Sequence, residues 1–259
     1  PFSILAETVS PFAMQSFIIA MIVLIALGTI IQMIHHKNLT YFLNNAKKAK
    51  LQATREIGTG ERVSILAKTA VVDIGTTAEL GFGKRRLSHV LGMYGTIIFW
   101  VSSAMLVFCY TGADKSSSTI WSMLWHVGAI LTCIGGYWFW LFLRVDVSAE
   151  AHPWYRIIKA DLFVLALLAC STFGLAWSYT QFNGQVGLSF LFLTLFVASN
   201  LVLFGGVYWS KFAHMFYKPG AAIQKNLAEA DGSRDNLPPL ADAPKQFGLG
   251  IKREEPKHY

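Results

Sequence analysis

Histidines are the residues of this sequence best suited to chemistry, and the chain has seven of them. His89 lies in the run Arg86-Leu-Ser-His-Val-Leu-Gly-Met-Tyr-Gly95, and His214 lies in Trp209-Ser-Lys-Phe-Ala-His-Met-Phe-Tyr-Lys218. A neutral imidazole offers a nitrogen ligand to a metal without adding a charge. Two imidazoles that face each other between helices are the usual axial ligands of a low-spin b-type haem. His89 and His214 are therefore candidate ligands of a haem iron.

The elements that must position these histidines are long uncharged runs. The chain is 54% hydrophobic and only 14% charged, which does not describe a soluble domain with an ordinary surface. Five runs without Asp, Glu, Lys or Arg reach the roughly 20 residues that a helix needs to cross a bilayer: Ala13–Ile34, Ser88–Thr111, Ser116–Leu143, Leu162–Asn183 and Gly184–Ser210. Because backbone amides in lipid must be bonded within their own segment, these runs predict helices. The predicted fold is all-α, a five-span transmembrane helix bundle.

The placement of the net charge of +7 predicts an orientation. Lys and Arg number 10 in His35–Leu87, 3 in Arg144–Asp161 and 8 in Lys211–Tyr259, and the one other is Lys115. Positive residues favour the cytoplasmic side, so we expect the N-terminal residues 1–12 outside and the C-terminus in the cytoplasm. His89 and His214 then reach the same, cytoplasmic, leaflet. The charge is accounted for without a nucleic-acid partner.

Residues 13–218 form the predicted membrane domain, and a cytoplasmic loop at 35–87 interrupts it. This loop contains helix-compatible stretches around Leu39–Glu56 and Glu61–Leu80, separated at Gly58-Thr-Gly60, and its basic and apolar mixture suits helices on an anionic membrane surface. A solvated linker is the alternative. Residues 219–259 are rich in proline and charge, and we expect an extended cytoplasmic tail whose last segment, Phe247–Tyr259, docks a partner.

The surroundings of the two histidines fit a haem in several ways. Arg85, Arg86 and Lys211 stand where haem propionates would emerge and could pair with them. Small residues near His89 (Gly92 and Gly95) and before His214 (Gly205 and Gly206) would let a flat macrocycle approach the helix backbone. The alternative is that both histidines are interfacial side chains bonded to headgroups or loops.

His126 lies inside the third run, and an ionisable residue at that depth is a functional-site hypothesis. It could bind a second haem, touch a quinone, or form a hydrogen bond with a backbone carbonyl. Asp161 and Lys159, at the start of the fourth run, read as a solvated edge.

The run around His89, which an apolar run follows, and the run around His214, at the end of the fifth span, resemble those of the five-helix cytochrome b subunits of the respiratory nitrate reductase gamma type. Related families are the membrane subunits of heterodisulfide reductase, of the sulfite-reductase-linked electron-transfer complex and of the quinone-interacting complex of sulfate respirers. The resemblance covers about Ser16–Lys218. The segment Lys218-Pro-Gly-Ala-Ala-Ile-Gln-Lys225 and the terminal strip look most like the membrane anchor of adenylylsulfate reductase in sulfur-oxidising bacteria.

The resemblance implies that His89 and His214 ligate haem b, in the inner membrane of a bacterium. It also implies quinone as an exchangeable redox partner and a cytoplasmic flavin and iron–sulfur oxidoreductase as a protein partner. Di-haem members of the family have a further histidine on the fifth span, where this sequence has Phe196. We therefore expect one haem, with His126 either a remnant ligand or part of a quinol pocket.

The sequence leads to the hypothesis of a membrane electron-transfer subunit that links a sulfur-metabolism oxidoreductase to the quinone pool. By itself such a chain is either non-catalytic or the quinone-reducing subunit of the complex. A haem-free membrane anchor that only docks the soluble enzyme is the alternative. A transporter is disfavoured because no run contains a buried charge or a broken helix.

Overall fold

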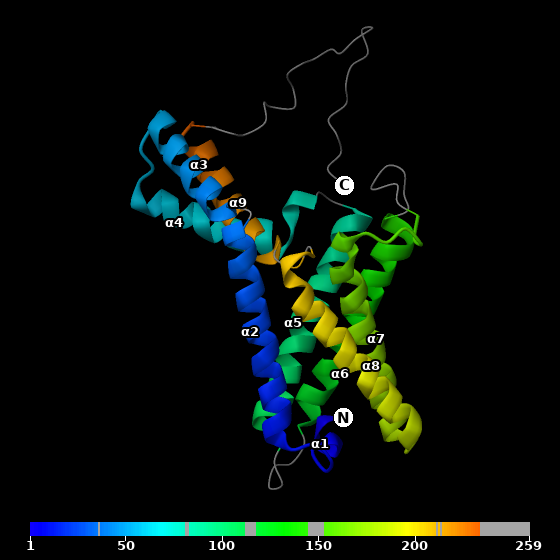
Figure 1. The fold of residues 1–259 in the computed structure, drawn as a ribbon. Helices are drawn as coiled ribbons and strands as arrows, with labels where there is room; N and C mark the ends of the chain where they lie inside the picture. Colours follow the sequence, from blue (N-terminus) through cyan, green and yellow to red (C-terminus); the bar gives the residue numbers. More distant parts are fainter. Residues whose placement is uncertain are drawn as a thin grey trace. The chain divides into compact units, whose positions relative to one another are not determined.

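The computed structural model describes residues 1–35, 37–80, 83–111, 118–144, 153–210, 212 and 214–233 (Figure 1). Every regular element in these ranges is a helix, as predicted. The chain divides into two compact units. The bundle unit contains Pro1–Gln32 and Leu87–Ala213, and the small unit contains Met33–Arg86 and the chain from His214 onward. Lys115, Lys211 and the terminal strip lie outside the described residues.

Five of the described helices are long and apolar enough to cross a membrane, which indicates a multi-pass membrane protein. They are α2 (Pro11–His35), α5 (Lys84–Cys109), α6 (Thr119–Trp138) with its π-helical extension η3 (Phe139–Leu143), α7 (Leu162–Phe182) preceded by the 3₁₀ turn η4 (Lys159–Asp161), and α8 (Val186–Gly205) followed by η5 (Gly206–Tyr208). Each lies within a few residues of a predicted span. A short helix, α1 (Phe2–Leu5), precedes them. The side of the membrane on which each end lies stays a prediction.

Helix α2 shows most clearly that the surroundings of the bundle are apolar. Of its side chains, only Met14 and Met21 are buried, and its other large apolar side chains are partly or fully exposed. Such a surface would be costly in water and is suited to lipid. Two glutamines hold the helix to the bundle unit: the Gln15 side chain donates to the carbonyl of Val107 at 3.4 Å, and Gln32 donates to that of Tyr208 at 3.1 Å.

Helices α5 and α6 touch each other through glycine. A Cβ added to Gly95 of α5 would lie 2.5 Å from the backbone nitrogen of Thr132, and one added to Gly128 of α6 would lie 2.5 Å from that of Phe99. A Cβ on Gly135 would meet the nitrogen of Gly92 at the same distance. Small residues let two membrane helices approach to backbone contact, where van der Waals packing takes the place of the hydrophobic effect. This contact fixes which face of α5 points into the bundle.

The small unit consists of α3 (Asn38–Gln52), α4 (Thr59–Lys68), the π-helical η1 (Thr69–Gly75), the 3₁₀ turn η2 (Ala78–Leu80) and α9 (His214–Ala230). The two helix-compatible stretches predicted in loop 35–87 are thereby confirmed as helical. The gap between them, around Gly58, is also where the structure leaves the helix.

The prediction of an extended tail from residue 219 is wrong as far as residue 230, because that segment continues helix α9. The residues with which α9 packs into the small unit have small side chains or none: Ala222 and Ala228 are buried, and Gly220 faces the ring of Phe42. The side chain of Asn226 donates to Thr69 Oγ1 and to Asp73 Oδ2, both at 2.7 Å. Two alanines, a glycine and the side-chain amide of Asn226 thus hold α9 in the small unit. A count of large apolar residues does not predict this helix.

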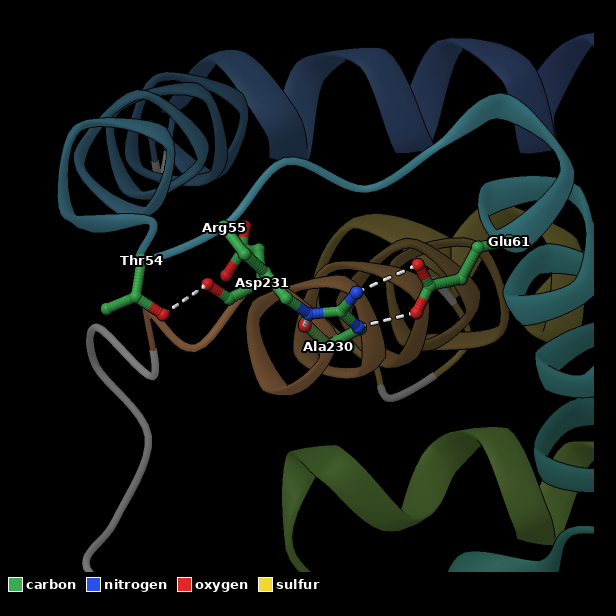
Figure 2. A network of polar contacts seen from close by, with 5 residues as sticks. All are labelled: Thr54, Arg55, Glu61, Ala230 and Asp231. Atoms are coloured by element: carbon green, nitrogen blue, oxygen red, sulfur yellow. Dashed lines mark hydrogen bonds and ion pairs between the residues drawn. The ribbon is translucent and has the colours of Figure 1, made fainter.

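The C-terminal end of α9 is tied to the linker between α3 and α4 (Figure 2). Thr54 donates through its backbone nitrogen (2.9 Å) and its hydroxyl (3.1 Å) to the carbonyl of Asp231, and Arg55 Nε donates to the carbonyl of Ala230 at 2.6 Å. The guanidinium of Arg55 also pairs with both oxygens of Glu61, which begins α4. Carbonyls left unbonded at a helix end are satisfied here by side chains from the sequence-distant linker.

Candidate functional site

The imidazole of His89 lies on an exposed part of α5, one residue after an anchored serine. Ser88 is buried, and its hydroxyl donates to the carbonyl of Gly135 on α6 at 2.7 Å. His89 is exposed, and a Cβ added to Gly92, one turn later, would meet nothing within 4 Å. The face of α5 around His89 and Gly92 is therefore open, while the neighbouring face is locked against α6.

The four glycines expected to make room for a macrocycle differ in how much space surrounds them. Gly95 is not available, because its α-carbon packs against the backbone of α6, and the expectation for it was wrong. Gly92 and Gly205 have open space where a side chain would stand. Gly206 lies under the indole of Trp209, whose Nε1 would be 3.6 Å from an added Cβ. Two of the four positions thus have open space where a side chain would stand.

The basic residues predicted to pair with propionates are found in different settings. Arg86 donates from Nε to the carbonyl of Thr76 at 2.8 Å and from Nη2 to its hydroxyl at 2.7 Å, within the small unit. Arg85 is half-buried in the first turn of α5. For Arg85 and Arg86 the pairing with propionates stays a prediction. The one for Lys211 falls outside the described residues.

His214 is the first residue of α9, in the small unit, whereas His89 belongs to the bundle unit. Nothing in the structure bears on the distance between the two, so their pairing stays a prediction. In the part of the chain that the structure describes, no three or more His, Cys, Asp or Glu side chains gather closely enough to hold a metal ion. A site that takes only two protein ligands is compatible with that finding.

His126 bridges two helices of the bundle with both ring nitrogens. Nδ1 lies 2.7 Å from the carbonyl of Ser122, one turn earlier on α6, and Nε2 lies 2.8 Å from the hydroxyl of Ser178 on α7. Because a carbonyl only accepts, Nδ1 must donate, and Nε2 of the neutral ring then accepts from Ser178. The ring also stands edge-on to Trp125, with centroids 5.0 Å apart. Of the three predicted roles, this geometry matches the hydrogen bond to a backbone carbonyl.

Phe196 belongs to a layer of aromatic rings in the same part of the bundle. It stacks on Trp177 with centroids 5.8 Å apart and planes 20° from parallel, and it meets Phe99 edge-on at 6.3 Å. Trp125 and Trp177 are completely buried, and Phe2 packs edge-on against both. Rings therefore occupy the volume around the position where the di-haem family has its additional histidine.

An apolar cavity of about 440 Å³ lies in the bundle unit between α1, α2, α5 and α8. Its few polar wall groups include the indole of Trp100, the hydroxyl of Ser103 and the amide of Asn200. Ser103 is already used, because it accepts from Trp125 Nε1 at 2.9 Å and donates to the carbonyl of Phe99 at 2.8 Å. Trp100 Nε1 is buried and has no hydrogen-bond partner among the described residues. This cavity, which the sequence did not predict, has the size of a small-molecule site.

Sequence reasoning also missed a buried ion pair where α6 and α7 are joined. Arg144 is completely buried, and its Nη2 lies 2.5 Å from Asp161 Oδ2. It also donates to the carbonyls of Pro153 (3.0 Å) and Arg156 (2.7 Å), and it lies over the ring of Trp140, 4.2 Å from the centroid. Lys159 is exposed as expected, but the expectation of a solvated Asp161 was wrong. Opposite charges that flank two consecutive apolar runs were the available signal.

Comparisons of the chain with protein-family models, with curated proteins and with solved structures give no match, so its family is not identified.

Proposed function

We propose that this protein is a membrane electron-transfer subunit that holds one haem b between His89 and His214. It would pass electrons between quinone and a cytoplasmic flavin and iron–sulfur oxidoreductase, with adenylylsulfate reductase the partner suggested by the sequence resemblance. The observation that carries the proposal is the exposed position of His89 beside the open space over Gly92, on a helix whose adjacent face is locked against α6.

The residues around His89 fit the demands of a haem ligand. The hydrogen bond from Ser88 to Gly135 fixes the turn of α5 from which the imidazole projects. Gly92 leaves open space where a side chain would stand, which gives a flat ring room on the same face. When bound, a haem supplies a one-electron carrier, and the polarity of its surroundings sets the reduction potential.

A single haem is favoured over two by the aromatic layer. Phe196 cannot ligate iron, and the rings of Trp177 and Phe99 pack against it. Both nitrogens of His126 already form hydrogen bonds, so binding a metal there would require breaking the bond to Ser178 or the bond to Ser122.

The apolar cavity supports quinone as the exchangeable redox partner. A quinone combines an apolar body with carbonyl acceptors, and the cavity has an apolar lining with the side chains of Trp100, Ser103 and Asn200 among its few polar groups. Trp100 follows His89 by 11 residues on α5, a rise of about 16 Å along the helix. The cytoplasmic enzyme partner is proposed from the sequence resemblance alone.

A haem-free membrane anchor is the second candidate, and two observations favour it. Gly95 is closed by α6, and Arg86 is bonded to Thr76, so two of the groups expected around a haem already have other partners. On this reading His89 is an interfacial side chain.

Spectroscopy of the purified full chain decides between the two candidates. We expect a reduced-minus-oxidised spectrum of a b-type cytochrome and about one haem per chain by pyridine haemochrome. Replacing either ligand, in His89→Ala or His214→Ala, removes an axial bond and should abolish or strongly reduce the haem content.

His35→Ala is the matched control, because His35 is an exposed histidine at the end of α2 and should keep the full haem content. His126→Leu should keep it too. A chain purified under native conditions without haem, or His89→Ala with an unchanged spectrum, would reject the haem proposal in favour of the anchor.

A further inference from the structure

In the helical segment formed by α4 and η1, two polar side chains, Thr69 and Asp73, face α9. Thr69 is completely buried, and its hydroxyl donates to the carbonyl of Ile65 at 2.8 Å. Asn226 of α9 donates to Thr69 and to Asp73, both at 2.7 Å. The face of this segment that packs against α9 is thus fastened by hydrogen bonds between polar groups.

The outward face of the same segment is apolar. Val63 is 60% exposed, Leu66 37% and Val71 66%, and between them Ala67 and Ala70 are exposed as well. These five residues, which we call the outer stripe, follow the i, i+3, i+4, i+7, i+8 spacing of one helix face. In a soluble protein a helix usually buries such an apolar face, and here the face is exposed. The outer stripe is therefore built for surroundings that are not water.

The charges beside the outer stripe are mainly positive. Arg62 and Lys68 are exposed on either side of it, and α3 contains Lys47, Lys48 and Lys50 without an acidic residue. The described residues of the small unit contain 12 Lys and Arg against 6 Asp and Glu. Anionic phosphate groups are the complement of such a surface.

The chain path keeps the small unit next to a bilayer surface. The chain enters it at the end of α2 and leaves it at the start of α5, and consecutive spans begin and end on the same side of a membrane. Only a few residues separate α2 from α3 and η2 from α5. Lipid headgroups are thus within reach of the unit without any further partner.

We propose that the outer stripe lies in the interfacial region of the bilayer, with Arg62 and Lys68 paired to the phosphates of anionic lipids. The segment would then be a monotopic helix whose apolar face enters the boundary between headgroups and acyl chains. Its polar contacts with α9 would carry that anchorage to the chain that continues beyond the described residues. This proposal is independent of whether the bundle binds haem.

Nitroxide accessibility in vesicles tests the location of the outer stripe. Single labels are placed at Val71→Cys and, as a control, at Glu56→Cys in the exposed linker, in full-length chain whose native cysteines are replaced by serine or alanine. In vesicles with one third phosphatidylglycerol, the label at 71 should show a ratio of oxygen to nickel-chelate collisions at least threefold above that of the label at 56. Equal ratios would overturn the proposal.

The second part of the experiment varies the charge of the lipid headgroups. The ratio at position 71 should fall at least twofold in pure phosphatidylcholine, and Arg62→Gln with Lys68→Gln should remove this dependence. A label at 71 that becomes shielded from both oxygen and nickel only when a cytoplasmic protein fraction is added would assign the stripe to a protein partner and overturn the lipid proposal.

Hydrogen exchange of the unmodified chain tests the same proposal without labels, so that a folding defect in the labelled variants cannot affect the result. Amides 63–71 should exchange at least tenfold more slowly in nanodiscs containing phosphatidylglycerol than in neutral ones. Equal rates would also count against the proposal.

Discussion

Arg144 keeps a full positive charge where none of its side chain reaches solvent. Its neighbours explain how: Asp161 supplies the opposite charge, two loop carbonyls accept hydrogen bonds, and the face of Trp140 lies beneath the guanidinium. Asp161 in turn accepts from the backbone nitrogen of Ile158 at 2.9 Å. The pair therefore closes the loop between α6 and α7 as a neutral unit, and removal of one member leaves the other unpaired in a buried place.

Asp161→Ala should lower the free energy of unfolding by about 3–5 kcal/mol, because a buried charge without its partner retains its desolvation cost. Unfolding of the full chain in detergent micelles, followed by tryptophan fluorescence, measures this loss. An unchanged stability would mean that Arg144 finds another partner.

Glu61→Ala is the matched control for that experiment, because Glu61 also pairs with an arginine but in an exposed position. We expect no measurable loss of stability. The hydrogen bond from Arg55 lowers the pKa of Glu61 below its ordinary value. The small contribution of this pair is therefore present at neutral pH and disappears as the pH falls through the lowered pKa.

The surroundings of individual side chains could not be predicted from the sequence. The positions of His89, Phe196 and Asp161 along the chain were evident, but their neighbours were not, because each neighbour lies on another element. Asp161 meets an arginine 17 residues earlier, and Phe196 meets rings from two other helices. Side-chain environment is set by how the helices are rotated against one another.

At the scale of elements, the contact between α5 and α6 decides that rotation. Gly95, Gly128 and Gly135 each face the backbone of the opposing helix, and Ser88 and Thr96 add polar contacts across the same interface. Turning α5 toward α6 through these small residues leaves His89 on the open side. The orientation of the candidate ligand thus depends on glycines that have no chemistry of their own.

Gly128→Ala should destabilise the bundle by about 1–3 kcal/mol, since the new Cβ would overlap the backbone of Phe99 and the helices must move apart. Gly187→Ala on α8 is the control, because an added Cβ there meets nothing within 4 Å. The detergent unfolding midpoint of the two variants measures the difference. Equal midpoints would show that α6 can shift without cost.

Helix α9 shows the limit of sequence reasoning for elements. Apolar runs predicted the five spans to within a few residues, because length and hydropathy alone decide whether a helix can cross a bilayer. The segment after Lys218 has prolines and few large apolar residues, which suggested an extended chain. It is helical because Ala222, Ala228 and Asn226 fit the groove made by α3, α4 and η1, a tertiary effect that overrides local composition.

At the scale of the whole molecule, the bundle unit combines an open face near His89 with a cavity further along the same helix. The cavity lies beside the middle of α2, whose apolar side chains from Phe17 to Ile25 form one of its walls. No single stretch of the sequence predicts this cavity, because its walls come from several helices. A ligand of suitable shape would fill the gap between α2, α5 and α8.

Trp100→Ala should weaken binding of the proposed quinone about 10- to 100-fold, as expected for loss of the apolar ring surface with which Trp100 lines the cavity, worth roughly 1.5–3 kcal/mol. Equilibrium binding of a short-chain naphthoquinone to the purified chain measures the change. Trp209→Ala is the control, because Trp209 is 56% exposed and does not line the cavity. Equal affinities for both variants would remove Trp100 from the proposed quinone site.

The pair of Arg144 and Asp161 has a further consequence for how the protein is made. During insertion, positive residues in short loops help to decide which side of a membrane a loop stays on, whereas acidic residues contribute little. Arg144 therefore counts fully as an orientation signal in the nascent chain, and it is neutralised only once α6 and α7 have come together. Arg144 thus acts first on the orientation of the loop during insertion and later in the folded ion pair, whereas Asp161 acts only in the ion pair.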